Sequence, residues 1–250
     1  MNNSKIEILE GKIALEVATP KDYIDWAEDL LLQGIEDEYL LMLVSYGVEK
    51  NPDSYEIKEY FEKSLKALNI QLSSPPVALK NYAKQIALQI AHNKISTLDG
   101  LDLLEPFYFK SDYEPVYSIW SQLEDDLVSL KCNDDYFYNS GLSNDNVEQY
   151  IKNIALQFSQ LLESQLPDNF FQLCVCQACG HIDLAGSRVI EKTWLSDKLF
   201  QFIFKRPLQE QAVCNKCGAP FPGSMMDYNY RQIYLDSVNN TPTDHTHSSL

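Results

Sequence analysis

The chain begins with an alternation of aliphatic and polar positions that is typical of a β-strand. Every second side chain is aliphatic in residues 6–8 and again in residues 13–17, and Glu10-Gly11 separates the two runs. A period of two places one face of a strand on the core, and glycine favours a turn between strands. The pattern therefore predicts a short N-terminal β-hairpin.

From Thr19 the apolar positions recur every three or four residues, which is the period of an amphipathic α-helix. Thr19 is a favourable N-cap, Pro20 suits the first helical position, and Gly34 follows the last apolar residue. A second helix is expected from the acidic cluster at residues 36–38, which suits the positive end of a helix dipole, to Gly47. Because the connection is very short, we expect these two helices to pack as an antiparallel pair.

The helical pattern returns four more times before residue 168. Asp53 followed by Glu56 has the spacing of a capping box, and Pro75-Pro76 opens a further helix. The apolar faces of the four helices span residues 57–68, 83–91, 116–127 and 147–162. This succession predicts a helical bundle or a stack of helical hairpins, and no residue signature recurs at the fixed period of a named repeat family.

The character of the sequence changes at Asp168-Asn169. Beyond it come short apolar runs, glycine, proline and all of the cysteines except Cys132. We therefore predict an α+β fold that is mainly α, with an acidic helical domain at residues 1–168 and a small β-rich domain at residues 169–239. Residues 240–250 have almost no apolar content, so they are expected to form a disordered tail.

Negative charge is concentrated in the first two-thirds of the chain. The formal net charge is −16, from 36 Asp and Glu against 20 Lys and Arg. The acidic excess lies before residue 171, where every basic side chain is a lysine. Such a surface repels phosphate backbones and anionic lipid and favours basic partners. The lack of arginine also disfavours a front half that clamps phosphate or carboxylate substrates.

The sequence indicates a soluble, cytoplasmic protein. No run approaches the roughly 20 apolar residues that span a bilayer. The first residues lack the basic, apolar and small-residue succession of a signal peptide. We therefore expect a reducing compartment in which cysteines stay as thiols or bind metal.

Two segments with the pattern C-x-x-C-G carry the strongest chemical signal. Their four cysteines are Cys176, Cys179, Cys214 and Cys217. Two thiolates on one tight turn can reach one metal ion, and a second such turn completes a tetrahedral four-thiolate shell for Zn²⁺. Over roughly 60 residues this part resembles a zinc ribbon built from two rubredoxin-like knuckles. The resemblance implies one structural Zn²⁺ per chain.

Other uses of these cysteines fit the pattern less well. Disulfides suit an oxidising compartment, a thioredoxin-like site needs one C-x-x-C in a βαβ setting, and catalytic zinc keeps an open position. Two alternative ligands stay open, because Cys174 would share a strand face with Cys176, and His181 directly follows the first knuckle. The long spacing between the knuckles contains an apolar stretch at residues 194–204, which predicts an inserted helix or hairpin.

No catalytic motif is recognisable, so no catalytic residue is assigned. The sequence contains no G-x-G-x-x-G, Walker A, G-x-S-x-G or H-E-x-x-H pattern. His92 lies near a predicted helix end, where a positive side chain complements the helix dipole. We therefore expect a protein that is not an enzyme.

Residues 99–148 combine dense negative charge with many aromatic rings. They hold 12 acidic side chains and only two lysines. A basic protein would be steered by such charge and anchored by the rings. The candidate contact residues are Phe107, Tyr108, Phe109, Asp112, Tyr113, Glu114, Glu124, Asp125, Asp126, Asp134 and Asp135. In the competing interpretation most of these rings belong to the core and the acids simply face water.

These features favour a non-enzymatic protein that binds a basic partner and carries a structural zinc site. In composition the chain is similar to acidic bacterial immunity proteins, which neutralise basic toxin nucleases by covering a cationic active site. The alternative is a zinc-ribbon protein that acts on nucleic acid or in transcription. Its basic face would comprise Arg188, Lys192, Lys198, Lys205 and Arg206. The neutral charge of residues 171–250 and the acidity of the rest argue against nucleic acid as a partner.

Overall fold

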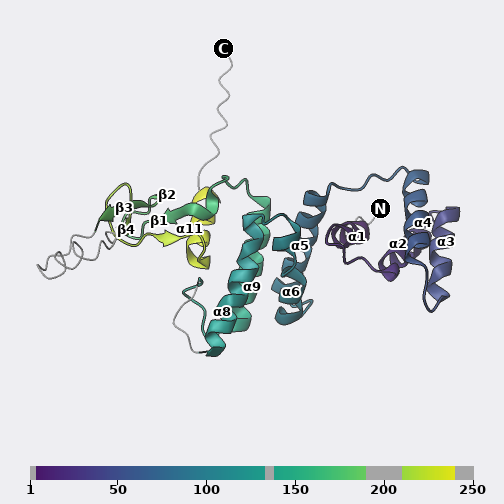
Figure 1. Cartoon of the computed structure of the whole chain (residues 1–250), viewed down its shortest axis with the longest axis horizontal. Coiled ribbons are helices and arrows are strands. Elements are labelled where there is room, and N and C mark those ends of the chain that lie inside the picture. The colour runs from purple at the N-terminus through teal and green to yellow at the C-terminus, as the bar shows by residue number, and fades with distance from the viewer. Residues whose placement is uncertain (1–3, 133–137, 190–209, 240–250) are drawn as a thin grey trace, which may run out of the picture. The chain divides into compact units, whose positions relative to one another are not determined.

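A computed structural model describes residues 4–132, 138–189 and 210–239 of the chain (Figure 1). The chain divides into two compact units, each defined by the contacts among its own residues. Unit 1 comprises Met1–Ser121 and Glu148–Leu162, and unit 2 comprises Gln122–Val147 and Glu163–Leu250. The domain boundary at residue 168 stays a prediction.

Unit 1 is built from helices. They are α1 (Ser4–Ala14), α2 (Pro20–Leu32), α3 (Glu38–Ser45), α4 (Ser54–Ala67), α5 (Pro75–Ala91), α6 (Thr97–Leu104) and α7 (Phe107–Lys110). Two short 3₁₀ turns, η1 (Tyr46–Val48) and η2 (Pro115–Tyr117), join them. The start of α8 (Ser118–Cys132) and most of α9 (Val147–Glu163) also belong to this unit. The prediction of a mainly helical front part is confirmed.

The predicted N-terminal hairpin is wrong, because the residues concerned form helix α1. Ile6, Leu9 and Ile13 recur at helical spacing as well, and Leu9 is buried. Gly11, which suggested a turn, instead permits close packing, since a Cβ at this position would overlap the side chain of Tyr82 on α5. A short aliphatic run fits both periods, and here the packing of α1 against α5 decides between them.

The starts of the first predicted helices are confirmed. At α2 the Asp22 carboxylate accepts hydrogen bonds from the Thr19 amide at 2.8 Å and the Thr19 hydroxyl at 2.7 Å. At α3 the Asp37 carboxylate accepts from the amides of Tyr39 and Leu40 at 3.0 and 3.1 Å. These bonds satisfy amides that have no partner inside their own helix.

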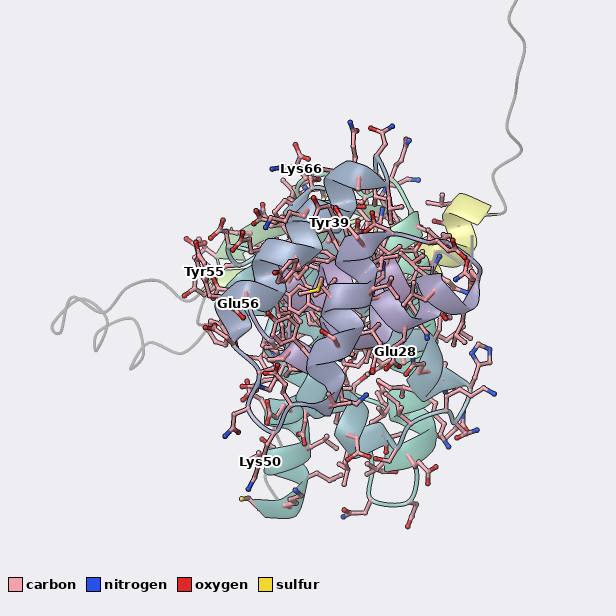
Figure 2. The ribbon with its side chains drawn as sticks, turned by 90° about the vertical axis from the view of Figure 1, so that its right-hand side faces the viewer. Glu28, Tyr39, Lys50, Tyr55, Glu56 and Lys66 are labelled. Atoms are coloured by element: carbon pink, nitrogen blue, oxygen red, sulfur yellow. The ribbon has the colours of Figure 1, made fainter. Side chains whose placement is uncertain are left out.

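The start of α4 follows the prediction only in part. Asp53 caps the helix by accepting a hydrogen bond from the Tyr55 amide at 2.7 Å. Glu56, which was expected to complete a capping box, instead accepts from the Tyr46 hydroxyl at 2.6 Å; Glu56 is labelled in Figure 2. Its side chain therefore links α4 to the 3₁₀ turn η1.

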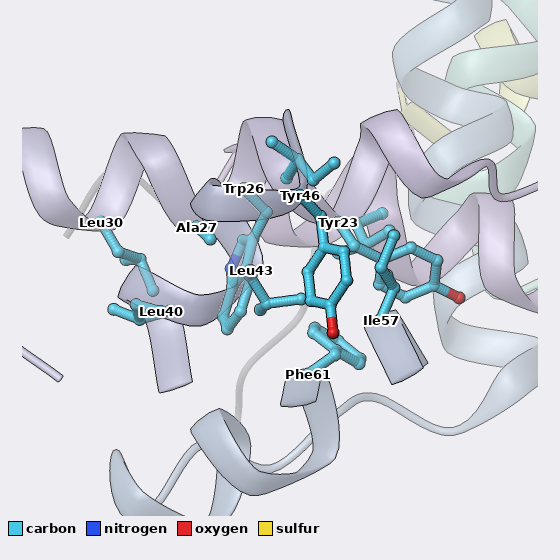
Figure 3. Packing of buried hydrophobic residues seen from close by; sticks show 11 residues of the cluster. Tyr23, Trp26, Ala27, Leu30, Leu40, Leu43, Tyr46, Ile57 and Phe61 are labelled. Atoms are coloured by element: carbon cyan, nitrogen blue, oxygen red, sulfur yellow. The ribbon is translucent and has the colours of Figure 1, made fainter. Parts of the chain in front are cut away.

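Helices α1 to α4 enclose one hydrophobic core, part of which is seen from close by in Figure 3. The ring of Phe61 from α4 stands edge-on to Tyr23 and Trp26 of α2, with ring centroids 5.0 and 4.9 Å apart. Leu40 and Leu43 of α3 are fully buried beside them. Edge-to-face aromatic pairs add to the stabilisation that apolar burial already gives.

A second set of aromatic contacts holds the later helices of unit 1 together. The Trp120 ring packs edge-on against Phe158 with centroids 5.0 Å apart. The fully buried ring of Phe107 lies 5.9 Å from Tyr82 and 5.6 Å from Tyr117. Residues from α5, α7, η2, α8 and α9 therefore share one packed interior.

Unit 2 contains small antiparallel sheets and a C-terminal helix. The strands are β1 (Leu173–Val175), β2 (Ile182–Leu184), β3 (Gly186–Val189), β4 (Glu210–Val213) and β5 (Gly223–Ser224). One sheet has the order β2-β1-β5 and the other pairs β3 with β4. A 3₁₀ turn, η3 (Phe170–Gln172), precedes β1, and α11 (Tyr228–Asn239), which the sequence did not predict, follows β5.

Two predicted features lie outside the described residues. They are the inserted helix or hairpin at residues 194–204 and the tail at residues 240–250. Within the part of the chain that is described, no helix combines the length and the apolar character needed to cross a membrane.

Candidate metal centre and acidic surface

Both C-x-x-C-G segments fold into the same turn. In the first, the Gly180 amide donates to the Cys176 carbonyl at 2.8 Å, and the Cys176 amide donates to the His181 carbonyl at 2.9 Å. The second turn repeats both bonds at 2.9 and 2.8 Å. Gly180 and Gly218 have φ angles of 68° and 72°, in the left-handed region that side chains disfavour. The glycine that ends each knuckle is thus required by the backbone.

The two turns bring the four cysteine sulfurs together. Cys176 Sγ lies 3.6 Å from Cys217 Sγ, and Cys179 Sγ lies 3.8 Å from Cys214 Sγ. All four sulfurs lie within 4.8 Å of one another. In a tetrahedron with zinc–sulfur bonds of about 2.3 Å, sulfurs stand about 3.8 Å apart. The cluster therefore fits a single metal ion, and the sequence-predicted ligands are the residues that meet.

Short strands position these turns. The first turn follows β1 directly, and the second follows β4 directly. The Asn215 side chain, inside the second turn, donates to the Leu184 carbonyl at the end of β2 at 2.7 Å. Gly186 leaves room for it, since a Cβ there would overlap the Asn215 amide. Asn215 therefore connects the second turn to β2, the strand that follows the first turn.

The cluster is unsymmetrical in exposure. Cys176 and Cys214 are buried, whereas Cys179 and Cys217 are exposed. Each turn thus contributes one inner and one outer thiol. An ion held between them would be reached from solvent only on the outer side.

Electrostatics within the cluster favour a bound cation. A hydrogen bond to the backbone of Cys217 lowers the pKa of the Cys214 thiol to about 6, and the Lys216 amide, 3.4 Å from the Cys214 sulfur, adds to this effect. At Cys217 the Ala219 backbone favours the thiolate, but neighbouring thiols, led by Cys179, outweigh it and raise the pKa to about 12. Thiols this close resist ionising together unless a cation compensates their charge.

The two alternative ligands lie outside the cluster. Cys174 on β1 pairs with Asp183 on β2 and Ser224 on β5, and burial raises the pKa of its thiol. His181 Nε2 lies 3.7 Å from Asp183 Oδ2. Neither side chain belongs to the group of four whose ligand atoms converge. Among the described residues, the group that could hold a metal ion consists of the four thiols of the two knuckles.

Three of the predicted aromatic contact residues form a cluster at the end of α7, which we call the aromatic triad: Tyr108, Phe109 and Tyr113. Tyr108 is partly buried and the other two rings are exposed. The ring centroids of the triad are 5.3 to 5.8 Å apart. Phe109 is 59% exposed and Tyr113 is 60% exposed. Asp112 and Glu114, on either side of Tyr113, are exposed as well. Solvated rings and carboxylates are therefore neighbours here.

The backbone beside the triad is strained. Asp112 and Tyr113 have φ angles of 56° and 63°, so two consecutive residues with side chains adopt the left-handed region. This conformation is uncommon for residues other than glycine, above all for a bulky one. It accompanies the turn in which Tyr113 contacts both Tyr108 and Phe109.

Two of the predicted contact residues are buried and therefore do not belong to an exposed binding surface. Phe107 is fully buried in the aromatic interior of unit 1. Asp126 on α8 is 1% exposed, although Glu124 and Asp125 beside it are exposed. Helical geometry explains the difference, because Asp126 lies three residues after the buried Leu123 and shares its face. Asp134 and Asp135 lie outside the described residues.

Asp126 accepts the hydrogen bonds of a buried network in unit 2. Its Oδ1 accepts from the Tyr138 amide at 2.7 Å, and its Oδ2 accepts from the Asn139 amide and side chain at 2.9 and 2.7 Å. The fully buried Arg231 of α11 donates to the carbonyls of Met225 and Met226 at 3.1 and 2.6 Å. These side chains are structural, and burial keeps both away from a partner.

Of the five basic residues expected to form a nucleic-acid surface, one lies in the described part of the chain, and the alternative function stays a prediction. Arg188 on β3 is exposed. The other four members of the predicted face, Lys192, Lys198, Lys205 and Arg206, lie outside the described residues. Arg231, the other arginine in the described part, is buried.

Comparison with known proteins identifies no relative of this chain. No protein-family model, curated protein or solved structure matches the chain.

Proposed function

We propose that the four clustered cysteines hold one structural Zn²⁺, and that the protein is a non-enzymatic binding protein for a basic partner. The sulfur separations of 3.6 and 3.8 Å support the metal site, because they agree with the edges of a zinc tetrahedron of about 3.8 Å. The exposed rings of Phe109 and Tyr113, beside carboxylates, support the binding role.

A structural role suits this site better than catalysis. Four thiolates fill the tetrahedral shell of zinc and leave no position for water or substrate. The strands around the site have between two and four residues, so each supplies few backbone hydrogen bonds to its sheet. A metal ion that bridges the two turns would supply a further cross-link.

The metal proposal is tested by elemental analysis of purified protein and its variants. We expect about one zinc per chain, and loss of zinc in Cys176→Ser and Cys217→Ser. Cys174→Ser is the matched control, since this thiol lies on β1 but outside the cluster. Retention of zinc in both knuckle variants, or its loss in the control, would contradict the proposed ligand set.

The binding proposal depends on the triad. Aromatic rings commonly anchor protein interfaces, and their faces attract the cationic groups of lysine and arginine. Carboxylates beside the rings would steer a basic partner and repel acidic ones. A toxin nuclease whose cationic active site is covered by this surface is one partner with the required chemistry.

The binding proposal is tested by comparing proteins retained from the host by the native chain and by variants. We expect a basic protein that is retained at low salt and released at about 0.5 M salt, where exposed charges are screened. Phe109→Ala and Tyr113→Ala should each abolish its retention. Tyr55→Ala is the control, because Tyr55 on α4 is 76% exposed but lies outside the triad (Figure 2). Retention of the same protein by both triad variants would refute the assigned surface.

A further inference from the structure

A cavity of about 250 Å³ opens in unit 1 between α1, α2 and the segment that leads into α5. Its apolar wall includes Ile6, Trp26 and Leu30, of which Trp26 and Leu30 are buried. Its polar lining includes three carboxylates and one ammonium group, from Glu7, Glu10, Asp29 and Lys5. The cavity thus joins an aromatic and aliphatic wall to an excess of negative charge.

Glu10 is the most informative of these groups. It is only 6% exposed, and its Oε1 accepts a hydrogen bond from the Ser73 amide at 2.9 Å. Among the described residues, no donor is bonded to its Oε2 and no lysine or arginine forms an ion pair with it. A buried carboxylate without a cationic partner is costly, so a cation that enters the cavity would meet a group already desolvated.

The other charges of the cavity do not neutralise Glu10. Lys5 Nζ pairs with Asp29 Oδ1 at 2.8 Å. Glu7 accepts a hydrogen bond from the neutral side chain of Gln85 at 3.0 Å. One ammonium group is therefore set against three carboxylates, and the excess amounts to two negative charges.

We propose that this cavity binds an organic cation, namely an alkylammonium or guanidinium group on a short apolar stem. The cationic end would pair with Glu10 and Glu7, and the stem would lie along Trp26 and Leu30. Trp26 can also attract the cation through the face of its indole ring. The volume is below the range of about 300 to 1,000 Å³ that is usual for drug-sized ligands, which suits a small aliphatic amine or one long side chain.

Such a cation could be a free diamine or the side chain of a basic protein. The two sources share the chemistry that the cavity recognises. Calorimetric titration of the full chain distinguishes them with 1,5-diaminopentane in one arm and the amides of Nα-acetyl-lysine and Nα-acetyl-arginine in the other. Tighter binding of the diamine identifies a metabolite site, and tighter binding of an amide identifies a side-chain pocket. 1-Pentanol is the neutral control, for which no saturable binding is expected.

The matched variants are Glu10→Gln and Glu28→Gln. Glutamine keeps the oxygen that accepts from the Ser73 amide but removes the charge, so we expect the affinity to fall at least about tenfold. Glu28 is exposed on α2 and does not line the cavity, so its variant should bind as the native chain does (Figure 2). The absence of saturable binding in both arms, or equal binding by Glu10→Gln, would overturn the proposal.

A second variant keeps the test decisive if Glu10→Gln does not fold. Asp29→Asn changes a side chain that is 23% exposed and releases the Lys5 ammonium group from its partner. The released ammonium would compete with the ligand for Glu10, so binding should weaken several-fold. Unchanged affinity in this variant would contradict the assigned charges. The titration is independent of the aromatic triad, and Tyr113→Ala should leave it unaltered.

Discussion

The two compact units are held together by different means. In unit 1, amphipathic helices bury large apolar side chains, and Leu40, Ile57 and Phe158 are fully buried. In unit 2 the strands have between two and four residues, and they meet at four thiols. Apolar burial accounts for the first arrangement. In the second, the proposed metal would add a cross-link to the apolar burial, and this difference makes metal dependence the property that should separate the units.

The same comparison separates two kinds of charged residue. Asp112 and Glu114 in unit 1 are exposed beside the aromatic triad. Asp126 and Arg231 in unit 2 are buried, and their hydrogen bonds go to neighbouring backbone and side-chain groups. An acidic residue therefore marks the proposed protein-binding surface only where the fold leaves it in water. A buried charge whose hydrogen bonds are met by its neighbours, as those of Asp126 and Arg231 are, is part of the structure.

Removal of the metal should have the largest effect. Coordination by four thiolates contributes on the order of 10 kcal/mol to the folding of small zinc sites. Chelation, or Cys176→Ser, should therefore abolish amide protection in β1 to β5, as measured by hydrogen exchange. Amides of α2 to α5 in unit 1 should keep their protection under the same conditions. Equal loss of protection in both units would remove the distinction between them.

Two phenylalanines on α7 allow the core of unit 1 to be compared with its surface. Phe107→Ala should lower the free energy of unfolding by about 3 to 5 kcal/mol, because the ring is fully buried. Phe109→Ala should change it by less than about 0.5 kcal/mol, since Phe109 is 59% exposed. Chemical denaturation measures both values. Zinc content should be unchanged in either variant.

Asp126→Ala tests the buried network of unit 2. The substitution leaves three hydrogen-bond donors of Tyr138 and Asn139 without their acceptor. We expect a loss of about 3 kcal/mol in the free energy of unfolding, measured with zinc bound. Asp125→Ala, at the exposed neighbouring position, is the control and should be near neutral. Similar effects at the two positions would show that Asp126 is not buried as described.

Gly11→Ala tests the helix that replaced the predicted hairpin. A Cβ at this position would overlap Tyr82, so α1 and α5 must move apart at a cost of about 1 to 3 kcal/mol. In a solvent-exposed helix the same change would stabilise by about 1 kcal/mol through helix propensity. The sign of the change in thermal stability therefore decides whether Gly11 packs against α5.

Among these predictions, the effect of pH on zinc affinity should be the smallest. Zinc displaces thiol protons, so its affinity falls as the pH falls. The pKa of Cys214 is lowered to about 6, so above that pH this thiol is already ionised and has no proton to lose. Below about pH 6 Cys214 is also protonated, and the affinity should fall more steeply with pH. Competition with a chromophoric chelator at several pH values measures the slope, and an unchanged slope across pH 6 would contradict the lowered pKa.

The features that could be predicted from the sequence are those that depend on residues close together in the chain. Thr19, Asp37 and Asp53 mark helix starts because each capping hydrogen bond joins groups only two or three residues apart. The knuckles were predictable for the same reason, since each pair of thiols and its glycine lie within one turn.

Features that depend on packing between distant segments were missed. The aliphatic alternation near the N-terminus fitted two periods, and the contact with α5 selected the helix. Glu10 and Asp126 were not recognised as buried, although helical spacing places each beside apolar residues of its own helix. A charged residue on an apolar helical face is the signal that would have identified both.

The proposed metal centre requires that the four knuckle cysteines are the complete ligand set of one zinc ion. X-ray absorption at the zinc edge of the purified chain identifies the atoms bound to the ion. We predict a first shell of four sulfurs at about 2.3 Å and no nitrogen or oxygen ligand. A shell that contains nitrogen or oxygen, or the absence of zinc from the purified chain, would contradict this ligand set.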